Sequence, residues 1–284
     1  MRPSLLSHIK RLATTETAPH GEPYLSLSTK ATLRLARSKK CKLKDVEFQA
    51  LEGRIIPERY QRNIGTLGIE GQAKLLQSQV AIVGVGGLGG SVLEHLARLG
   101  VGKIICIDGD SFVDSNLNRQ VLSQMKNLGE LKVKAARRRV KDINPAIETK
   151  VYSEMANPEN LPKLIQGSQA VVDGLDNIQT RFVVESACRK MQIPFVHGAV
   201  AGFVGQVMTV FPEDKGLESI YGPRVFSELG AETEFGNPSM TPALIATWQA
   251  SEVVKILLEW GNTLRNKVLV IDLKTQMMEI VDLI

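Results

Sequence analysis

The chain has 284 residues, 43% of them hydrophobic, and a net charge of +5. This is enough apolar material for one large or two small cores. No apolar run is long enough to span a membrane, and the N-terminus lacks the apolar core of a secretory signal. The three cysteines, Cys41, Cys106 and Cys188, form no CxxC pair, so we expect a cytoplasmic protein without membrane attachment.

Residues 1–55 are predicted to form an N-terminal arm and a small helical appendage. Residues 1–27 show no clear period and indicate a loose arm, whereas residues 28–51 indicate two short helices with a basic break. Two helices alone are weak evidence for a helix-turn-helix DNA reader, so a docking appendage is favoured and nucleic acid is the less favoured partner. The basic residues of this region are Lys10, Arg11, Lys30, Arg34, Arg37, Lys39, Lys40, Lys42 and Lys44.

Residues 56–284 are predicted to form one large domain, separated from the appendage by Pro57. Strands and helices alternate regularly from residue 80 to residue 201. Such alternation, with nearly continuous apolar strands, predicts a Rossmann-like α/β fold with helices on both faces of a mostly parallel sheet. We expect strands at VAIVGV, KIICID, IETKVY, QAVVDGL and PFVHGAV, and helices over residues 90–99, 132–143, 160–165 and 180–191.

The pattern changes after Gly202. GQVMTVF indicates a strand without a following helix, and residues 212–240 indicate a long loop. An apolar helix over residues 241–260 and a closing hairpin, NKVLVIDL with QMMEIVDL, complete the chain. Antiparallel strands are therefore expected to continue the parallel sheet.

A glycine-rich loop, Gly84-x-Gly86-x-x-Gly89, stands between the first strand and its helix. Glycines allow a backbone to approach phosphates, and the helix N-terminus offers free N–H groups. Asp108 follows the second strand, where an acid can hold ribose hydroxyls. Taken alone, this pattern fits a nicotinamide or flavin enzyme as well as an ATP site.

Two cationic residues favour an ATP site over a nicotinamide or flavin site. Arg119 lies in the segment SNLNRQ, and Lys132 stands at a helix start; together with a glycine loop they suit a triphosphate whose charge must be neutralised. Either residue alone could be an ordinary surface charge. Asp176 follows the fourth strand, where it could hold Mg²⁺ against phosphate oxygens or cap the helix that begins near Ile178.

Taken together, these motifs resemble the MoeB/ThiF/HesA family, relatives of the catalytic core of ubiquitin-activating enzymes. The resemblance rests on RYQR at residues 59–62, the glycine loop, Asp108, SNLNRQ, the lysine of GELK and LDN at residues 175–177, in the family's order. It implies ATP·Mg²⁺-dependent adenylation of the C-terminal Gly-Gly carboxylate of a ubiquitin-like sulfur carrier such as MoaD or ThiS.

The resemblance also implies a role for each matching residue. Gly84, Gly86 and Gly89 would line the nucleotide loop, and Asp108 would hold the ribose. Asn116, Arg119 and Lys132 would grip the phosphates, and Asp176 would lie beside Mg²⁺, with Asn177 next to it in the nucleotide site. Arg62 matches the family arginine that reaches into the partner subunit's site, which implies a homodimer.

Two features depart from the family pattern. The segments that carry two zinc-binding CxxC pairs in many members contain no cysteine here, so we expect no zinc site. The crossover loop ELGAETEFGNPSMTP has Glu232 near the position of the cysteine that some members use for thiol transfer. Cys106 and Cys188 are expected to be buried packing residues.

Two alternatives stay open. The first keeps adenylation but places the carboxylate on a small molecule or on tRNA, which only the basic appendage favours. The second is a non-catalytic nucleotide-binding scaffold, suggested by the missing crossover cysteine. The sequence does not identify the carrier, whose sulfur could go to molybdopterin, tungstopterin, thiamine or another product.

Overall fold

A computed structural model describes the chain except residues 1–3, 19–20, 223–231 and 284. Its larger sheet has eight strands in the described part of the chain. They are β4 (Gln79–Val83), β5 (Lys103–Ile107), β6 (Glu148–Tyr152), β7 (Ala170–Asp173), β8 (Phe195–Ala201), β9 (Val204–Val210), β10 (Lys267–Asp272) and β11 (Met277–Asp282).

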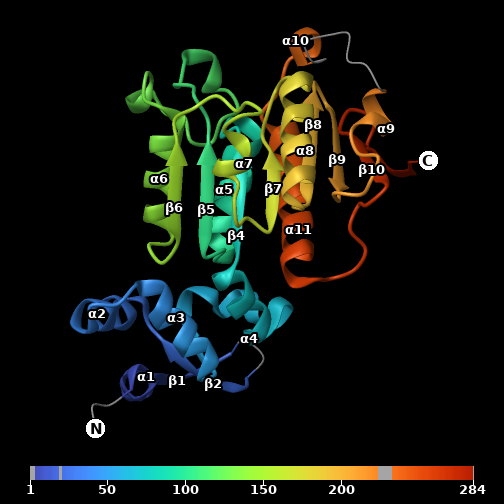
Figure 1. The fold of residues 1–284 in the computed structure, drawn as a ribbon. Coiled ribbons are helices and arrows are strands. Elements are labelled where there is room, and N and C mark those ends of the chain that lie inside the picture. Colours follow the sequence, from blue (N-terminus) through green and yellow to red (C-terminus); the bar gives the residue numbers. More distant parts are fainter. Residues whose placement is uncertain (1–3, 19–20, 223–231, 284) are drawn as a thin grey trace.

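The order across this sheet is β11-β10-β9-β8-β7-β4-β5-β6. Neighbouring strands from β6 to β8 pair in parallel, whereas β9, β10 and β11 continue the sheet with antiparallel pairs. The predicted fold class is confirmed, including the closing hairpin (Figure 1).

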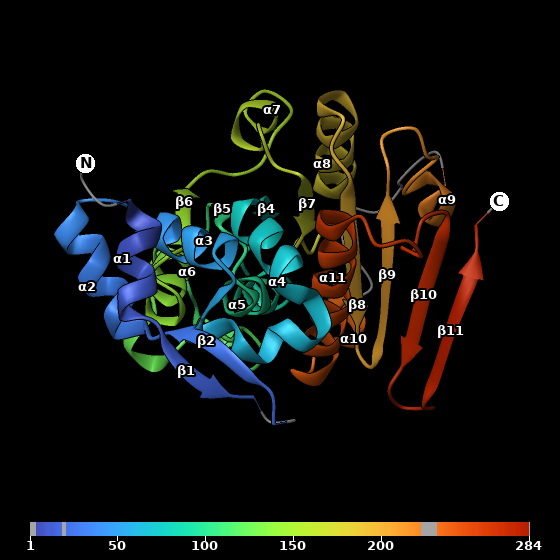
Figure 2. The same cartoon turned by 90° about the horizontal axis from the view of Figure 1, so that it is seen from below.

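Helices cover both faces of the sheet (Figure 2). One face carries α5 (Gly87–Leu99), α6 (Lys132–Ile143) and α11 (Met240–Leu258), and the other carries α7 (Leu161–Leu164), α8 (Ile178–Met191) and α9 (Glu218–Tyr221). Successive residues of β4 enter opposite cores, Val80 and Ile82 on the α5 side and Ala81 and Val83 on the α8 side. Burial on both faces explains why the central strands are apolar throughout.

The two core cysteines are packing residues, as predicted. Cys106 belongs to the core on the α5 side and Cys188 to the core on the α8 side. Burial raises the pKa of the Cys106 thiol to about 12. Burial also raises the pKa of Cys188 well above its usual range. Neither sulfur is therefore a ready nucleophile.

The N-terminal appendage contains more structure than expected. The two predicted helices are present as α2 (Thr29–Lys39) and α3 (Leu43–Glu52). The prediction of a loose arm over residues 1–27 is wrong, because α1 (Leu5–Leu12), β1 (Thr14–Thr17) and β2 (Pro23–Leu27) lie there. Together with β3 (Ile55–Pro57) the two strands form a small sheet, in which β2 pairs antiparallel with β1 and parallel with β3.

The appendage lies at the end of the large sheet from which the parallel strands start (Figure 1). It has a hydrophobic core of its own, which includes Ile9, Leu35 and Val46. We propose that the chain divides into an appendage and a larger domain. The predicted boundary between residues 55 and 56 falls inside β3, so we propose that the division follows Pro57.

Two further segments join these parts. After the appendage, α4 (Gln61–Gln77) leads into β4 and is interrupted at Gly68, where φ is +68°. Part of the long loop predicted over residues 212–240 is helical, as α9 and α10 (Glu232–Phe235). Residues 223–231 and the side chain of Glu232 lie outside the described residues. Within the described part, no helix is long and apolar enough to cross a membrane.

Candidate nucleotide-binding site

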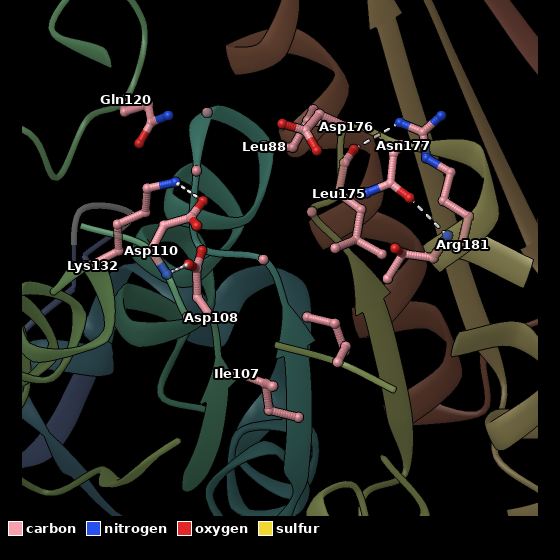
Figure 3. A pocket seen from close by; sticks show the side chains of 18 of the residues that line it. Leu88, Ile107, Asp108, Asp110, Gln120, Lys132, Leu175, Asp176, Asn177 and Arg181 are labelled. Atoms are coloured by element: carbon pink, nitrogen blue, oxygen red, sulfur yellow. Dashed lines mark hydrogen bonds and ion pairs between the residues drawn. The ribbon is translucent and has the colours of Figure 1, made fainter. Parts of the chain in front are cut away.

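A cavity opens beyond the C-terminal ends of β4, β5 and β7. Strand β4 lies between β5 and β7, so the connections run in opposite directions from it. Open α/β sheets bind ligands at such switch points. Lys132, Asp110 and Asp108 lie on one side of the cavity, and Asp176, Asn177 and Arg181 lie on the other (Figure 3).

The glycine loop runs from β4 into α5 and forms one wall of the cavity. Gly84 has φ of +83°, and a Cβ there would lie 2.6 Å from the carbonyl oxygen of Gly174. Gly86 is the N-cap of α5, and no described side chain caps the first turn of that helix. Its first N–H groups are therefore available to an anion, in the field of the positive end of the helix dipole.

Asp108 follows β5 and fixes the glycine loop from the opposite wall. Its Oδ2 accepts a hydrogen bond of 2.8 Å from the N–H of Val85, and its Oδ1 accepts one of 2.8 Å from the N–H of Asp110. Burial raises the pKa of this carboxyl, although Lys132 and the two N–H groups act in the opposite direction. Both oxygens keep lone pairs that could accept ribose hydroxyls.

Lys132 begins α6 and reaches into the cavity. Its Nζ lies 2.9 Å from Oδ2 of Asp110 (Figure 3). The lysine side chain is 10% exposed, whereas that of Asp110 is 59% exposed. The ammonium group is thus held in place while its present partner faces solvent, and an arriving phosphate oxygen could replace that partner.

The SNLNRQ segment supplies the next two lining residues. Nη1 of Arg119 donates to the carbonyl oxygen of Ser115 at 3.1 Å and to Oδ1 of Asn118 at 2.9 Å. Gln120 is 6% exposed, and its Oε1 has no hydrogen-bond partner among the described residues. A buried amide oxygen without a partner on a cavity wall indicates a position that a ligand or water would satisfy.

The loop after β7 carries the predicted metal residue. The helix-capping alternative for Asp176 is wrong, because Asn177 is the N-cap of α8 and its Oδ1 accepts a 2.8 Å hydrogen bond from the N–H of Thr180. Asp176 itself lines the cavity. Capping by the neighbouring asparagine leaves the Asp176 carboxylate for a ligand.

The chain is similar to known proteins in sequence and in fold. A profile of the ThiF family matches residues 60–283, most of the chain. The chain belongs to the ThiF family. It is 34% identical over 219 residues to the "SAMP-activating enzyme E1" of Haloferax volcanii, covering 76% of this chain and 81% of that protein. It is 32% identical over 234 residues to the "Sulfur carrier protein adenylyltransferase" of Thermus thermophilus, covering 76% and 83%.

Solved structures share the fold of this ThiF-family chain. Escherichia coli MccB with ATP has a TM-score of 0.68 at 22% identity, covering 90% of this chain and 79% of that one. The E. coli tRNA N6-threonylcarbamoyladenosine dehydratase TcdA with AMP has a TM-score of 0.61 at 23% identity, covering 71% of this chain and 95% of that one. The named relatives are adenylyltransferases of the ThiF/MoeB type, and the chain is an enzyme of that type.

Most of the residues predicted for the site of this ThiF-family chain meet in the one cavity. Three do not line it. Gly89 packs against β4, since a Cβ there would lie 1.9 Å from the carbonyl oxygen of Gly84. The Oδ1 of Asn116 accepts a 3.2 Å hydrogen bond from the N–H of Val113 and so shapes the Arg119 loop. Arg62 is exposed on α4, outside the cavity lining. The residues that do line it are Gly84, Gly86, Asp108, Arg119, Lys132, Asp176 and Asn177.

The cavity also contains residues that the sequence did not single out. Met155 follows β6 and packs against Gly109, where a Cβ would lie 2.7 Å from its sulfur. Arg181 and Asn237 also line the cavity. Gln120, which also lines the cavity, lies in the SNLNRQ motif. Met155, Arg181 and Asn237 match none of the motif positions used to predict the site.

The side chains present fit a magnesium ion carried by a nucleotide. No group of three or more His, Cys, Asp or Glu within the described ranges is placed to hold a metal ion by itself. Mg²⁺ commonly binds through one or two carboxylates together with substrate phosphates, which suits the single carboxylate of Asp176. The absence of zinc stays a prediction.

Proposed function

We propose that this chain binds ATP with Mg²⁺ in the cavity and adenylates the C-terminal Gly-Gly carboxylate of a ubiquitin-like sulfur-carrier protein. The observation that carries the proposal is the convergence of the glycine loop, Asp108, Arg119, Lys132 and Asp176 on one cavity. The names of the Haloferax and Thermus relatives, which refer to a SAMP and to a sulfur carrier, support this class of partner.

In the proposed reaction, a carboxylate oxygen of the carrier attacks the α-phosphorus of ATP. The bond from that phosphorus to the bridging oxygen breaks, and pyrophosphate leaves with the electron pair. No protein nucleophile is needed. The α5 N-terminus and Gly86 would hold the phosphates, Asp108 would hold the ribose, and Arg119 and Lys132 would offset the charge that repels the incoming carboxylate. Mg²⁺, when bound near Asp176, would neutralise further phosphate charge.

The described residues of the cavity include too few cationic side chains to offset the charge of both ATP and an incoming carboxylate. Among the cationic side chains that line the cavity, Lys132 is paired with Asp110 and Arg181 with Asp173. Arg119 forms no ion pair with any described residue. A triphosphate and a carboxylate together therefore carry more negative charge than this wall offsets. We propose that Mg²⁺ and Arg62 of a second copy supply the remainder in a homodimer.

Pyrophosphate exchange tests this proposal. The wild-type chain should exchange labelled pyrophosphate into ATP only with a carrier protein that ends in Gly-Gly. Arg119→Ala and Asp176→Asn should each reduce that exchange by about 100-fold or more, since the first removes a cation that would offset the phosphate charge and the second removes the carboxylate that would hold Mg²⁺. Arg98→Ala is the matched control, because Arg98 lies on the exposed side of α5 and pairs with Glu94. Exchange in both site variants at the wild-type rate would refute the mechanism.

A second candidate is adenylation of a carboxylate carried by tRNA. The fold likeness to the tRNA-modifying TcdA and the exposed basic side chains of α2, Lys30, Arg34 and Arg37, favour it. These three residues follow the i, i+4, i+7 spacing of one helix face. Binding of tRNA that weakens steeply with salt, and is lost in a triple Ala variant, would support this candidate. Carrier-dependent exchange without tRNA binding would leave the sulfur-carrier proposal.

A further inference from the structure

Three charged or ionisable side chains are buried beside the Asp176 loop. Asp173 ends β7, His197 lies on β8 and Arg181 lies on α8; the first two are fully buried and Arg181 is 3% exposed. Oδ2 of Asp173 lies 2.6 Å from Nδ1 of His197 and 3.2 Å from Nε of Arg181. Burying such groups destabilises the folded chain unless their partners compensate. Their position beside a ligand cavity therefore points to a role at that cavity.

The cluster fixes the backbone of the residue before Asp176. The N–H of Leu175 donates a 2.9 Å hydrogen bond to Oδ1 of Asp173. The carbonyl oxygen of Leu175 accepts one of 2.7 Å from Nη2 of Arg181 (Figure 3). On the other side, Asn177 is tied to α8 by its capping bond. Both neighbours of Asp176 are thus anchored, which restricts where its carboxylate can point.

The cluster continues from His197 to α9. Burial lowers the pKa of His197, so its ring is neutral near pH 7, with the Nδ1 proton directed at Asp173 and Nε2 free to accept. The hydroxyl of Tyr221, the last residue of α9, lies 3.2 Å from that Nε2 and accepts a 2.8 Å hydrogen bond from Nε2 of Gln206. Tyr221 also hydrogen-bonds Arg181.

We propose that Asp173, Arg181 and His197 are positioning residues that hold the Asp176 loop in the geometry needed by a metal-bound triphosphate, with Tyr221 supporting Arg181 from α9. The inference rests on the proposed function, because it takes Asp176 as the carboxylate that meets the metal-bound nucleotide. Arg181 acts through Leu175. Its fork spans the Asp173 carboxylate and the Leu175 carbonyl at once, which a single ammonium group does not do.

Calorimetric binding of two probes to the full chain tests this: ATP with Mg²⁺, and AMP without metal. Arg181→Gln should weaken ATP·Mg²⁺ binding about tenfold, the loss expected for a hydrogen bond from a charged group. AMP binding should change less than about twofold, because AMP depends on Asp108 and the glycine loop rather than on a metal-facing carboxylate. Arg189→Gln is the matched control on the same helix, where Arg189 pairs with Glu185 away from the cavity.

Two milder variants keep the test decisive if Arg181→Gln does not fold. Arg181→Lys should show the same selective loss at intermediate size, and Tyr221→Phe should weaken only ATP·Mg²⁺ binding, about twofold to threefold. Equal losses for both probes, or no loss in folded Arg181→Lys and Tyr221→Phe, would overturn the inference. Wild-type protein that fails to bind ATP·Mg²⁺ would instead refute the proposed function.

Discussion

Tyr60 donates a 2.9 Å hydrogen bond to the buried carboxylate of Glu47 and accepts one of 2.9 Å from Nδ2 of Asn144. Glu47 lies on α3 of the appendage, and Asn144 directly follows α6 of the larger domain. Arg59 joins the same group, with Nε 3.1 Å from Glu47 and Nη1 2.8 Å from Oδ1 of Asn144. The RYQR motif therefore also ties the two parts of the chain together.

Tyr60→Phe should lower the free energy of unfolding by about 1–3 kcal/mol, because the buried Glu47 carboxylate loses its hydroxyl donor and, among the described residues, keeps only its ion pair with Arg59. Chemical denaturation of the full chain measures this. Tyr24→Phe, at a partly exposed position of β2, is the control and should change the free energy of unfolding by less than about 0.5 kcal/mol. Equal effects of the two changes would contradict the joining role of Tyr60.

The fold of residues 80–284 was predictable because its elements repeat strong local signals. The predicted helix over residues 132–143 is α6 residue for residue, and the closing hairpin pairs as expected. Two other elements gave no such signal. The polar strand β1, Thr14–Thr17, is exposed at every position and has no apolar alternation. Helix α4 contains Gly65, Gly68 and Gly71, which lower helix propensity, and it breaks at Gly68.

The site was predictable where a motif fixed both the residue and its loop. Gly84, Asp108 and Lys132 lie at strand and helix ends, so the topology brings them together. Arg181 and His197 could not be placed, because their contacts depend on how α8 and β8 pack beside β7. Arg62 lies outside the cavity of its own chain, and its proposed role depends on a second copy.

The proposed dimer can be tested by mixing two inactive variants. In a mixed dimer of Arg62→Ala and Asp176→Asn chains, the cavity that keeps Asp176 would receive the intact Arg62 of the other chain. Random mixing makes half of the dimers mixed, each with one complete site, so about a quarter of wild-type exchange should return. No return of activity, although the mixed dimer is shown to form, would contradict the exchange of Arg62 between subunits.

We expect the rate of pyrophosphate exchange to depend strongly on Lys132 and only weakly on its ion-pair partner Asp110. Lys132→Met should reduce carrier-dependent exchange by about 100-fold, because the phosphates lose a held cation. Asp110→Asn should leave exchange within about fivefold, since the carboxylate is mostly exposed and such pairs contribute little. Steady-state exchange rates check both variants. A larger loss for Asp110→Asn than for Lys132→Met would reverse the assignment.

Because His197 is buried, we predict that the folded chain loses stability in mild acid. Burial lowers its pKa in the folded chain, although the facing Asp173 raises it and Arg181 lowers it further. The unfolded chain therefore binds the proton first, and stability falls as the pH drops below the ordinary histidine value, about 6.5, towards the folded pKa. The slope from this residue is at most about 1.4 kcal/mol per pH unit. Denaturation between about pH 7 and pH 5 should show a shallower slope for His197→Gln; an unchanged slope would contradict the assignment.

We propose that this cavity attaches AMP to the C-terminal carboxylate of a carrier protein. The most direct measurement is intact-protein mass spectrometry of a Gly-Gly carrier after incubation with the enzyme, ATP and Mg²⁺. We predict an added AMP on the full-length carrier, none on a carrier that lacks the last glycine, and none with Asp176→Asn enzyme. An unmodified carrier with active wild-type enzyme, or AMP on the truncated carrier as well, would refute adenylation of a Gly-Gly carrier in this cavity.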